Sequence, residues 1–527
     1  MSQSAVRARV LVGAILIQLI LGTVYGYSIF WRPLDAQVFP AVVTEAEFRK
    51  LEAGGTNRSE VTVVEDDAAK KRRESEQQGY LKYAFSICIL SFAGTMVVAG
   101  RVQDLKGPRF TATIGGLLMG GGFLVAGLMN HFIVFYLAHA AFAGLVTLLL
   151  LALFRMLTRN ADAEQRAMLR DVPMAIVAAC VVAAVLLGQR YVGHLGEIDR
   201  LFMLWGTVGF LAGAGIGFAY VCPIAALIKW FPERKGLVSG IAVAGFGFGA
   251  YIFSHPHLPF SAENYLRAHG IVSLFTAHGL VSIVAVTLGA ALLTNPPAAP
   301  QVKFESTWQD TLRRPAFYAL WLMFFSGALA GLMVIGILKG FAGEQLVDAA
   351  GGAAALGDAR ARDLFDRGVA VVGWLAVFNA LGRIVWGMVS DRVGRTTAFV
   401  AMFLLQAVMM FVLGGLDTEL SLAVGASIVG FNFGGNFALF PSATADLFGA
   451  KNLGANFGWV FTSYGIAGVV GIIAGNAAKS ATGSYAAAFS VAGVLCVMSA
   501  ALAIGMHVQK RRALAQVGSG TAVTGLR

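Results

Sequence analysis

The sequence predicts an all-α integral membrane protein built from two related halves, and three observations support this prediction. The chain of 527 residues is 57% hydrophobic and only 13% charged, whereas soluble proteins use about a quarter of their residues as Asp, Glu, Lys and Arg. Apolar stretches long enough to cross a bilayer, which takes about 20 residues, recur from residue 10 to residue 508. A short charged turn occurs twice, once in each half of the chain.

Fourteen apolar stretches are predicted to be membrane-spanning helices, because each holds about 18 or more residues and ends at a cluster of charges. The first is longer than the core of a signal peptide and ends in WRPL without a small-residue cleavage site, so we interpret it as a span. The predicted limits are 10–31, 80–100, 109–129, 132–154, 172–190, 201–228, 237–256, 270–294, 315–338, 368–389, 396–415, 419–441, 455–477 and 485–507.

The basic residues predict the orientation of these spans. Lys and Arg are concentrated in the short turns on the same side as the N-terminus, which is typical of cytoplasmic turns. We therefore predict that both termini are cytoplasmic and that the protein is a monomer in a bacterial inner membrane. The same topology explains the net charge of +11 without nucleic acid as a partner.

Two longer outer segments, 34–79 and 341–367, interrupt this pattern, and the first contains the mixed-charge run EDDAAKKRRESEQQ. We interpret that run as a solvated surface. The four cysteines lie within apolar stretches and lack metal-ligand spacing. We therefore expect no disulfide, no metal site and no cofactor.

The charged turn that recurs reads GRVQDLKGPR at residues 100–109 and GMVSDRVGR at residues 387–395. Glycine permits the sharp bend between two antiparallel helices, and an acid beside a helix N-terminus stabilises its packing. A charge latch of this kind opens when the two halves rock against each other. The residues predicted to form these conformational gates are Asp104, Gly107, Arg109, Asp391, Gly394 and Arg395.

A second pair of turns supports the repeat, because KWFPERKG at 229–236 corresponds to DLFGAKNLG at 446–454. One such turn alone is equally well explained as an ordinary charged connection. Two matched pairs at matching topological positions indicate an internal duplication.

This arrangement resembles the major facilitator superfamily, whose two six-helix halves enclose a central substrate site. The resemblance implies a major-facilitator-like fold with an inserted two-helix hairpin, about 14 spans in all. The predicted division is an N-terminal half at 1–294, a cytoplasmic linker at 295–314, a C-terminal half at 315–508 and a cytoplasmic tail at 509–527. The first half carries the outer insertion 34–79 and the extra hairpin 132–190.

Three longer stretches narrow the resemblance: GTVYGYSIFWRPL at 22–34, GIGFAYVCPIAALIKWFPERKGLVSGIAVAGFGFGA at 215–250, and GGNFALFPSATADLFGAKNLGANFG at 434–458. Together they resemble the oxalate/formate antiporter family, relatives of the monocarboxylate transporters. The GFGFG run at 245–249 lacks a surrounding strand-turn-helix unit, so we interpret it as helix packing and not as a nucleotide loop.

Arg383 is the strongest candidate for substrate binding, because an ionisable residue inside a span is costly and therefore a functional candidate. It lies seven residues before Ser390, about 10 Å inside that end of the helix. Its planar guanidinium matches a carboxylate. The alternative is an arginine that pairs with a helix carbonyl or packs internally. The family resemblance also implies a basic residue in this helix, the eighth of the family's twelve.

The resemblance implies a second basic residue in the eleventh helix, where this chain reads NFGWVFTSYGIAGVVG and Tyr464 or a close neighbour takes that place. One buried positive charge balances one carboxylate, whereas a dicarboxylate would leave a negative charge uncompensated. We therefore predict a monocarboxylate such as formate, lactate or pyruvate in preference to oxalate.

Other polar side chains within the spans are candidates for the same cavity, although each is also explained by helix packing. His278 lies in the middle of a span and is a candidate for proton coupling, or a hydrogen bond between helices. The predicted substrate-binding residues are Arg383, Asn379, Tyr464, Tyr220, Tyr25, Tyr27, Asn432 and Asn436.

The sequence thus predicts a secondary transporter that moves a small carboxylate by alternating access and is not an enzyme. Two alternatives remain at this point. One is a transporter of the same fold with a solute that is not a carboxylate, and the other is a transporter-derived sensor or scaffold. The exact substrate, the direction of flux and the choice among antiport, proton symport and uniport do not follow from the residues.

Overall fold

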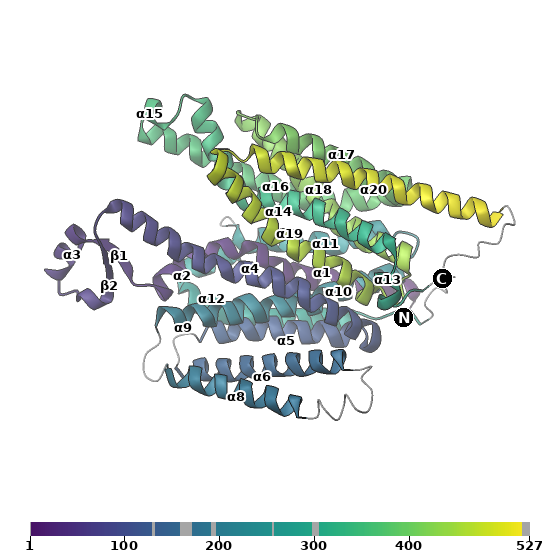
Figure 1. Ribbon diagram of the computed structural model, residues 1–527, viewed down its shortest axis with the longest axis horizontal. Coiled ribbons are helices and arrows are strands. Elements are labelled where there is room, and N and C mark those ends of the chain that lie inside the picture. The colour runs from purple at the N-terminus through teal and green to yellow at the C-terminus, as the bar shows by residue number, and fades with distance from the viewer. Residues whose placement is uncertain are drawn as a thin grey trace.

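The computed structural model describes residues 2–128, 132–158, 171–190, 196–255, 258–297 and 305–518. Long helices run roughly side by side, and the start of α1 (Gln3–Leu21) and the end of α20 (Ala486–Gly518) lie at one end of the bundle, here called the termini end (Figure 1). Among the described residues, twelve helices are long and apolar enough to cross a membrane. The all-α membrane fold is therefore confirmed, whereas the count of fourteen spans is not.

The first half of the chain, up to residue 294, supplies six of these spans. Its first span begins as an α-helix and continues as a 3₁₀ helix, and its fourth contains a π-helical turn. The elements are α1 (Gln3–Leu21), η1 (Gly22–Phe30), α4 (Asp67–Lys106), α5 (Pro108–Ala126), α9 (Glu197–Leu204), η3 (Trp205–Leu211), α10 (Ala212–Trp230), α11 (Lys235–Ser254) and α12 (Ala262–Leu292).

The second half supplies the other six spans and two short helices. Its elements are α13 (Trp308–Leu312), α14 (Pro315–Ala349), α15 (Ala353–Leu356), α16 (Asp358–Val393), α17 (Arg395–Leu413), α18 (Glu419–Phe448), α19 (Leu453–Thr482) and α20 (Ala486–Gly518). Across the two halves, α4 packs against α19 and α11 packs against α16.

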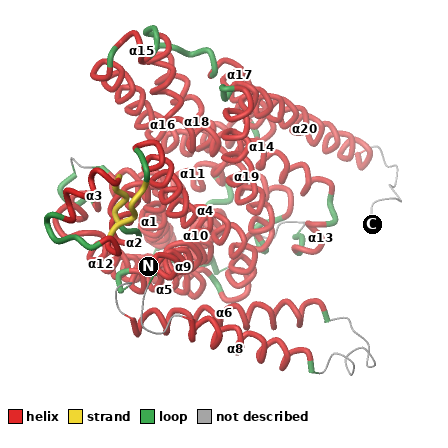
Figure 2. Tube along the Cα trace, turned by 60° about the vertical axis from the view of Figure 1, so that its left-hand side comes forward, coloured by secondary structure: helices red, strands yellow, loops and turns green. Residues whose placement is uncertain are grey.

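The extra hairpin consists of α6 (Phe132–Leu157) and α8 (Val172–Arg190), which pack against each other. Both helices lie at the edge of the bundle in two views (Figures 1 and 2). Their described apolar cores, Ala143–Met156 and Val172–Ala183, are shorter than those of the twelve spans. Whether they cross the membrane remains a prediction.

The outer insertion folds into small elements at the end opposite the termini. They are α2 (Trp31–Val38), β1 (Ala41–Thr44), α3 (Glu45–Glu52), η2 (Arg58–Glu60) and β2 (Val61–Val64). β1 and β2 pair in parallel, with Ala41 opposite Val61. The Nζ atom of Lys70 lies 2.8 Å from Oε2 of Glu47, which ties the start of α4 to α3.

Several helices extend well beyond the apolar stretches that predicted them. The stretch 80–100 becomes α4, whose Asp66 side chain accepts a hydrogen bond from the Ala69 amide and caps the helix. The residues between this cap and the apolar stretch are mostly good helix formers, including KKRRESEQQ. A hydropathy limit marks the lipid-facing part of a helix, whereas the helix itself ends where its capping ends.

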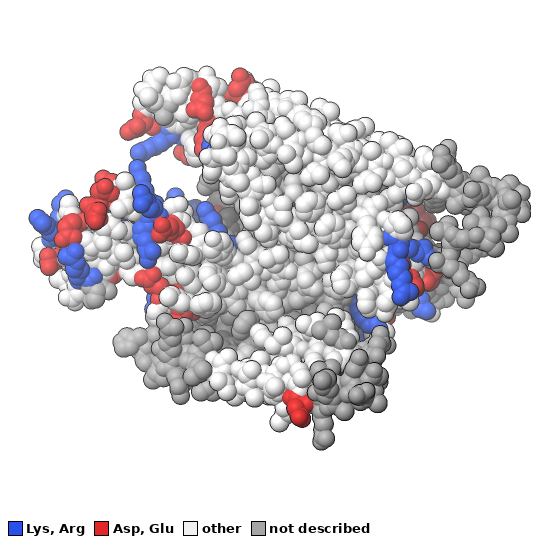
Figure 3. Space-filling view, viewed as in Figure 1, with Lys and Arg blue, Asp and Glu red and all other residues white. Residues whose placement is uncertain are grey.

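Charged side chains gather at the two ends of the molecule and leave an uncharged middle on the visible face (Figure 3). An apolar belt between two charged ends fits a bilayer, in which charges are costly. Together with the twelve apolar helices, this distribution identifies an integral membrane protein.

Candidate functional site

Arg383 lies on α16 at the contact between the two halves, and its side chain is fully buried. Its Nε donates to Oδ1 of Asn379 at 3.1 Å, one turn earlier on the same helix. Its Nη1 donates to the carbonyl oxygen of Val243 on α11, in the other half, at 2.6 Å. Its Nη2 has no hydrogen-bond partner among the described residues. The alternative that Arg383 pairs with a helix carbonyl therefore accounts for Nη1. It leaves Nη2 available to donate a hydrogen bond to a substrate.

Two phenylalanines flank the guanidinium of Arg383. Its Cζ lies 4.6 Å from the ring centroid of Phe437 on α18 and 5.7 Å from that of Phe246 on α11. A cation over an aromatic face is stabilised by the quadrupole of the ring, and more so away from water. These rings stabilise the buried charge without using its hydrogen-bond donors.

The same two rings continue to a pair of tyrosines. Phe246 packs edge-on against Tyr25 of η1 at 5.2 Å between centroids, and Phe437 packs against Tyr464 of α19 at 5.5 Å. The hydroxyl oxygens of Tyr25 and Tyr464 lie 2.6 Å apart and share a hydrogen bond across the two halves. Arg383, Phe246, Tyr25, Tyr464 and Phe437 thus form a closed series of contacts, which we call the central ring.

Tyr220 of α10 lies beside the central ring. Its ring packs edge-on against Phe246 at 5.5 Å and against Phe92 of α4 at 5.0 Å. Arg383 lies within electrostatic range of the hydroxyls of Tyr25, Tyr220 and Tyr464. The structure therefore brings four predicted residues, one arginine and three tyrosines, to one place.

The three predicted asparagines, Asn379, Asn432 and Asn436, belong to helices of the second half, α16 and α18. Asn379 orients Arg383, as described above. Oδ1 of Asn432 accepts from Nε1 of Trp386 at 3.2 Å, and the amide nitrogen of Asn436 donates to the Asn432 carbonyl at 3.2 Å. Nδ2 of Asn432 and Oδ1 of Asn436 are buried without a hydrogen-bond partner among the described residues.

Tyr27 and His278 belong to a separate cluster inside the first half. Tyr27 packs against Phe123, and His278 packs against the same ring at 4.5 Å. Nε2 of His278 lies 3.2 Å from Oγ1 of Thr23. That hydroxyl already donates to the Ile20 carbonyl, so the histidine nitrogen is the donor. These contacts fit the alternative of a hydrogen bond between helices, and a role of His278 in proton coupling stays a prediction.

The first charged turn forms a latch between the halves. The carboxylate of Asp104, at the end of α4, accepts from the amides of Gly454 and Ala455 at 3.1 and 2.8 Å. These amides belong to the first turn of α19, where the helix dipole favours an anion. Nζ of Lys229 lies 3.9 Å from the same carboxylate. We call this group the Asp104 latch.

The second charged turn forms the corresponding contact in the opposite direction. The carboxylate of Asp391, on α16, accepts from the amides of Gly236 and Leu237 in the first turn of α11, at 2.9 and 2.7 Å. Nη2 of Arg395 lies 2.8 Å from Asp391, and its Nε lies 3.0 Å from Asp446. Nζ of Lys235 also contacts Asp446 at 2.7 Å. We call this group the Asp391 latch.

The remaining turn residues have local roles. Gly107 and Gly394 have φ values of 87° and 88°, a conformation that favours glycine and ends each helix sharply. Nε of Arg109 donates to the carbonyl of Leu293 at 2.6 Å, so this arginine holds the start of the linker. All six predicted gate residues thus lie at the termini end.

The central linker connects the halves at this same end. The amide of Ser306 donates to the Phe448 carbonyl at 2.9 Å, and Nδ2 of Asn452 donates to the Ser306 carbonyl at 3.0 Å. Hydrogen bonds from Thr307 lower the pKa of Asp310, which caps α13. The described end of the linker is therefore fixed to the turn between α18 and α19.

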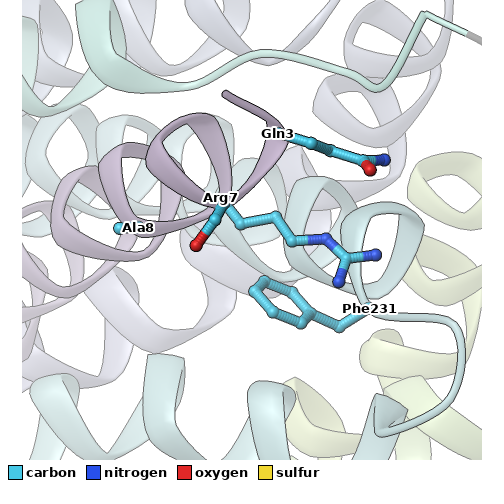
Figure 4. Close-up of a pocket in the computed structure, with 5 residues that line it drawn as sticks. Gln3, Arg7, Ala8 and Phe231 are labelled. Carbon is cyan, nitrogen blue, oxygen red and sulfur yellow. The ribbon is translucent and has the colours of Figure 1, made fainter. Parts of the chain in front are cut away.

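A cavity of about 450 Å³ opens at the termini end, away from the central ring (Figure 4). It is lined by Gln3, Ser4, Arg7, Ala8 and Phe231. The guanidinium of Arg7 lies over the ring of Phe231, with Cζ 5.0 Å from the centroid, and its Nη1 lies 3.7 Å from Glu233. Its basic residue already has two partners, so this cavity is a weaker candidate than the central ring.

Sequence reasoning missed Phe246, Phe437 and Val243. The chain has 38 phenylalanines, and although Phe246 lies in the GFGFG run and Phe437 in the stretch at 434–458, neither position indicates that its ring flanks Arg383. A backbone carbonyl such as that of Val243 carries no sequence signal at all. Lys229 and Asp446 were part of the matched turns, but their pairing with the latches required the fold.

Comparison with known proteins supports the resemblance to the major facilitator superfamily. The model of the Major Facilitator Superfamily matches residues 361–522. The chain is 28% identical over 282 residues to the uncharacterized MFS-type transporter YhjX of Escherichia coli (strain K12), which covers 51% of this chain and 64% of that one. This is a family of transporters, which confirms the prediction that the chain is not an enzyme.

Two further relatives carry named substrates. The oxalate:formate antiporter of Oxalobacter formigenes is 29% identical over 299 residues, 55% of this chain and 65% of that one. Apicoplast pyruvate carrier 1 of Toxoplasma gondii is 28% identical over 334 residues, 52% of this chain and 59% of that one. The matched regions thus span less than two thirds of the length of these relatives, 65% and 59%.

Solved structures share the fold at low sequence identity. The proton:xylose symporter XylE has a TM-score of 0.54 at 13% identity and covers 95% of each chain. The human organic anion transporter MFSD10 has a TM-score of 0.51 at 13% identity, and the match covers 94% of this chain and 99% of that one. The chain therefore has the fold of major facilitator transporters, matches the model of that superfamily over 361–522, and is similar to the oxalate:formate antiporter.

Proposed function

We propose that this protein is a secondary transporter that moves a small monocarboxylate across the membrane by alternating access. The observation that carries the proposal is Arg383, a fully buried guanidinium at the junction of the two halves whose Nη2 lacks a partner among the described residues. A buried charge without a counter-ion is costly, and a substrate anion would remove that cost.

The composition of the central ring supports a substrate with one carboxylate. Arg383 is the one cation of the ring, and Tyr464 and Tyr25 are neutral donors. An anion with a single charge is neutralised there, whereas oxalate would keep one negative charge in a low-dielectric site. The phenylalanine rings suit the methyl group of lactate or pyruvate, and formate is small enough to fit beside them. The names of the oxalate:formate antiporter and the pyruvate carrier support a carboxylate as the class.

Alternating access is supported by the position of the two latches. Both join the halves at the termini end, and both would have to release their helix N-termini for that end to open. The predicted gate residues, Asp104, Gly107, Arg109, Asp391, Gly394 and Arg395, would act there. In this proposal the termini end is cytoplasmic, and the protein works as a monomer in a bacterial inner membrane.

Proton coupling through His278 is proposed as a separate, optional part of the mechanism. The side chain is buried against Phe123 and Phe253. Exchange of one anion for another needs no protonatable group, so His278→Gln should abolish transport only if the protein is a proton symporter. Flux measured with and without a pH gradient separates the two cases.

The decisive experiment is uptake of labelled formate, lactate, pyruvate and oxalate into proteoliposomes. Arg383→Ala should reduce monocarboxylate uptake by about 100-fold or more, because a buried charge pair contributes roughly 2–5 kcal/mol. Arg362→Ala is the matched control, since this exposed arginine lies on the same helix and away from the charged turn. Unchanged carboxylate uptake by the Arg383→Ala protein would exclude the anchor.

The same assay distinguishes one carboxylate from two. Tyr464→Lys adds a second positive charge to the central ring and should raise the preference for oxalate over formate. If the wild-type protein moves none of the four anions but moves a neutral solute, the proposed carboxylate substrate is wrong. The alternative of a transporter with the same fold and a different solute would then hold.

A further inference from the structure

The cavity at the termini end lies against the first two turns of α1. Gln3, Ser4, Arg7 and Ala8 come from this helix, and Phe231 comes from the turn that follows α10. The first amides of a helix carry a partial positive charge, which favours an anion. The first turn of α1 contains no acidic residue that would use this charge. The cavity of about 450 Å³ therefore has an electropositive wall.

Arg7 is the cation of this cavity, and two contacts hold its guanidinium without accepting a hydrogen bond. Its Cζ lies 5.0 Å from the ring centroid of Phe231. Its Nη1 lies 3.7 Å from the carboxylate of Glu233, which is longer than the N–H···O hydrogen bonds of about 2.7–3.2 Å found in proteins. Its Nε is buried and has no hydrogen-bond partner within the described part of the chain. The ring and the ion pair therefore orient the guanidinium and leave its donors to a ligand.

The polar side chains of the cavity can bind one ligand together. Figure 4 shows the amide end of Gln3 and the guanidinium of Arg7 extending to the same side, with the ring of Phe231 beside the guanidinium. The amide nitrogen of Gln3, the guanidinium and the hydroxyl of Ser4 are all hydrogen-bond donors. Several donors around a cavity larger than a carboxylate needs favour an anion with three or four oxygens. Arginine pairs with phosphate through two parallel hydrogen bonds.

We infer that this cavity binds a phosphate group, with Arg7 as the charged anchor and with Gln3 and Ser4 as further donors. The group can come from free phosphate or from the headgroup of a lipid. Arg7 lies three residues before Val10, the first buried residue of α1, and therefore near the membrane surface, where lipid phosphates also lie. The inference goes beyond the proposed transport of a carboxylate and does not depend on it.

Glu233 opposes this ligand. The side chains of Arg7 and Glu233 are 34% and 53% exposed, so water reaches their ion pair and weakens it. The carboxylate would repel a phosphate group beside Arg7, and its removal should therefore tighten phosphate binding. A zwitterionic ligand would behave in the opposite way, because its ammonium group would pair with Glu233. The Glu233→Gln variant therefore distinguishes a phosphate anion from a zwitterion.

The test measures the affinity of the purified full chain, in a maltoside detergent, for two probes. Isothermal titration calorimetry measures inorganic phosphate, and native mass spectrometry measures a short-chain phosphatidylglycerol. Binding of either probe supports the inference and identifies the source. Arg7→Gln should weaken that binding by about 10-fold or more, because charge-assisted hydrogen bonds are lost. Glu233→Gln should tighten it by about 3-fold. Arg362→Gln is the matched control, since this exposed arginine lies near the start of α16, away from the termini end.

Several results would overturn the inference. They are no binding of either probe, equal affinity in the wild-type and Arg7→Gln proteins, and weaker binding in the Glu233→Gln protein. Loss of binding in the Arg383→Ala protein but not in the Arg7→Gln protein would place the phosphate in the central ring instead. If Arg7→Gln fails to fold, Arg7→Lys provides a second comparison, because lysine keeps the charge and loses the planar fork. Affinity should then fall several-fold, and an unchanged affinity would exclude the guanidinium as the anchor.

These binding measurements are separate from the transport assay. Absence of carboxylate flux in the wild-type protein would exclude the proposed function and leave the phosphate site standing. Carboxylate flux that depends on Arg383, in a protein that binds neither phosphate probe, would leave the function standing and exclude the phosphate site.

Discussion

The Asp104 and Asp391 latches are built from the same short motif, yet their charges are supported very differently. Both carboxylates accept two backbone amides from the first turn of a helix in the other half. Among the residues that the structure describes, Asp104 forms one ion pair, with Lys229 at 3.9 Å, and Arg101 adds a more distant positive charge. Asp391 is part of a network in which Arg395 also pairs with Asp446, and Lys235 pairs with Asp446 in turn.

Burial makes this difference matter. The Asp104 and Lys229 side chains are only 6% and 8% exposed, whereas Asp446 at the edge of the other network is 34% exposed. A buried pair that loses one member leaves an uncompensated charge, while a network member that loses one partner keeps another. We therefore expect that removing one charged residue costs the Asp104 latch most of its stability. Removing one charged residue should cost the Asp391 latch only part of its stability.

The largest effect is expected from Asp104→Ala, because it leaves Lys229 buried without its nearest counter-ion. The cost to the state with a closed termini end should be about 3–5 kcal/mol. Spin labels at the exposed positions 106 and 451 would report the distance across this latch. A double variant, Asp104→Asn with Lys229→Met, should restore much of the closed state, since it removes both charges. Failure of this rescue would show that the backbone contacts alone matter.

Asp391→Ala is expected to have a smaller effect, about 1.5–3 kcal/mol, which corresponds to the loss of charge-assisted hydrogen bonds to two amides. Arg395 would keep Asp446 as a partner, so no buried charge is left alone. Labels at the exposed positions 234 and 392 would measure the distance across this latch. A cost equal to or larger than that of Asp104→Ala would contradict the idea that the network protects against the loss of one member.

The close backbone contacts of the two latches are similar, although their charged groups differ. A Cβ at Gly454 would clash with the Gly100 carbonyl, and a Cβ at Gly236 would clash with the Gly387 carbonyl. Gly454→Ala and Gly236→Ala should each push a helix pair apart, at about 1–3 kcal/mol. The same two label pairs measure this, and Gly373→Ala is the control because a Cβ there meets nothing within 4 Å. Unequal costs would show that packing, and not charge alone, distinguishes the latches.

Much of this arrangement could be predicted because it depends on features that a linear sequence records. The two acidic turns were visible as a repeat, and Arg383 was visible as a lone charge within an apolar span. Tyr25, Tyr220 and Tyr464 were candidates of the same kind, and the structure brings them to Arg383.

The rest could not be predicted, since a membrane helix is apolar on every side and its sequence does not reveal which face meets a neighbour. Tyr27 and Tyr25 are two residues apart, yet Tyr27 packs against Phe123 within the first half while Tyr25 reaches Tyr464 in the second. The difference in support between the latches depends on Lys229 and Asp446, which no spacing rule connects to the acids they accompany. The strands β1 and β2 read AVVT and VTVV, and runs of only four residues are too short to establish a strand from the sequence.

The smallest expected effect is the response to salt, which should differ between the two latches because ions screen exposed charges more than buried ones. Raising the NaCl concentration from about 0.1 to about 1 M shortens the Debye length from about 10 to about 3 Å. The Asp391 network, which includes the partly exposed Asp446, should weaken by less than about 1 kcal/mol. The Asp104 latch should respond less, and the label pair 106 and 451 should report little change. In an Asp446→Ala protein the pair 234 and 392 should lose most of its salt dependence, because both ion pairs of the exposed carboxylate are gone. Equal salt responses at both label pairs would mean that the two latches differ in geometry but not in how far water reaches their charges.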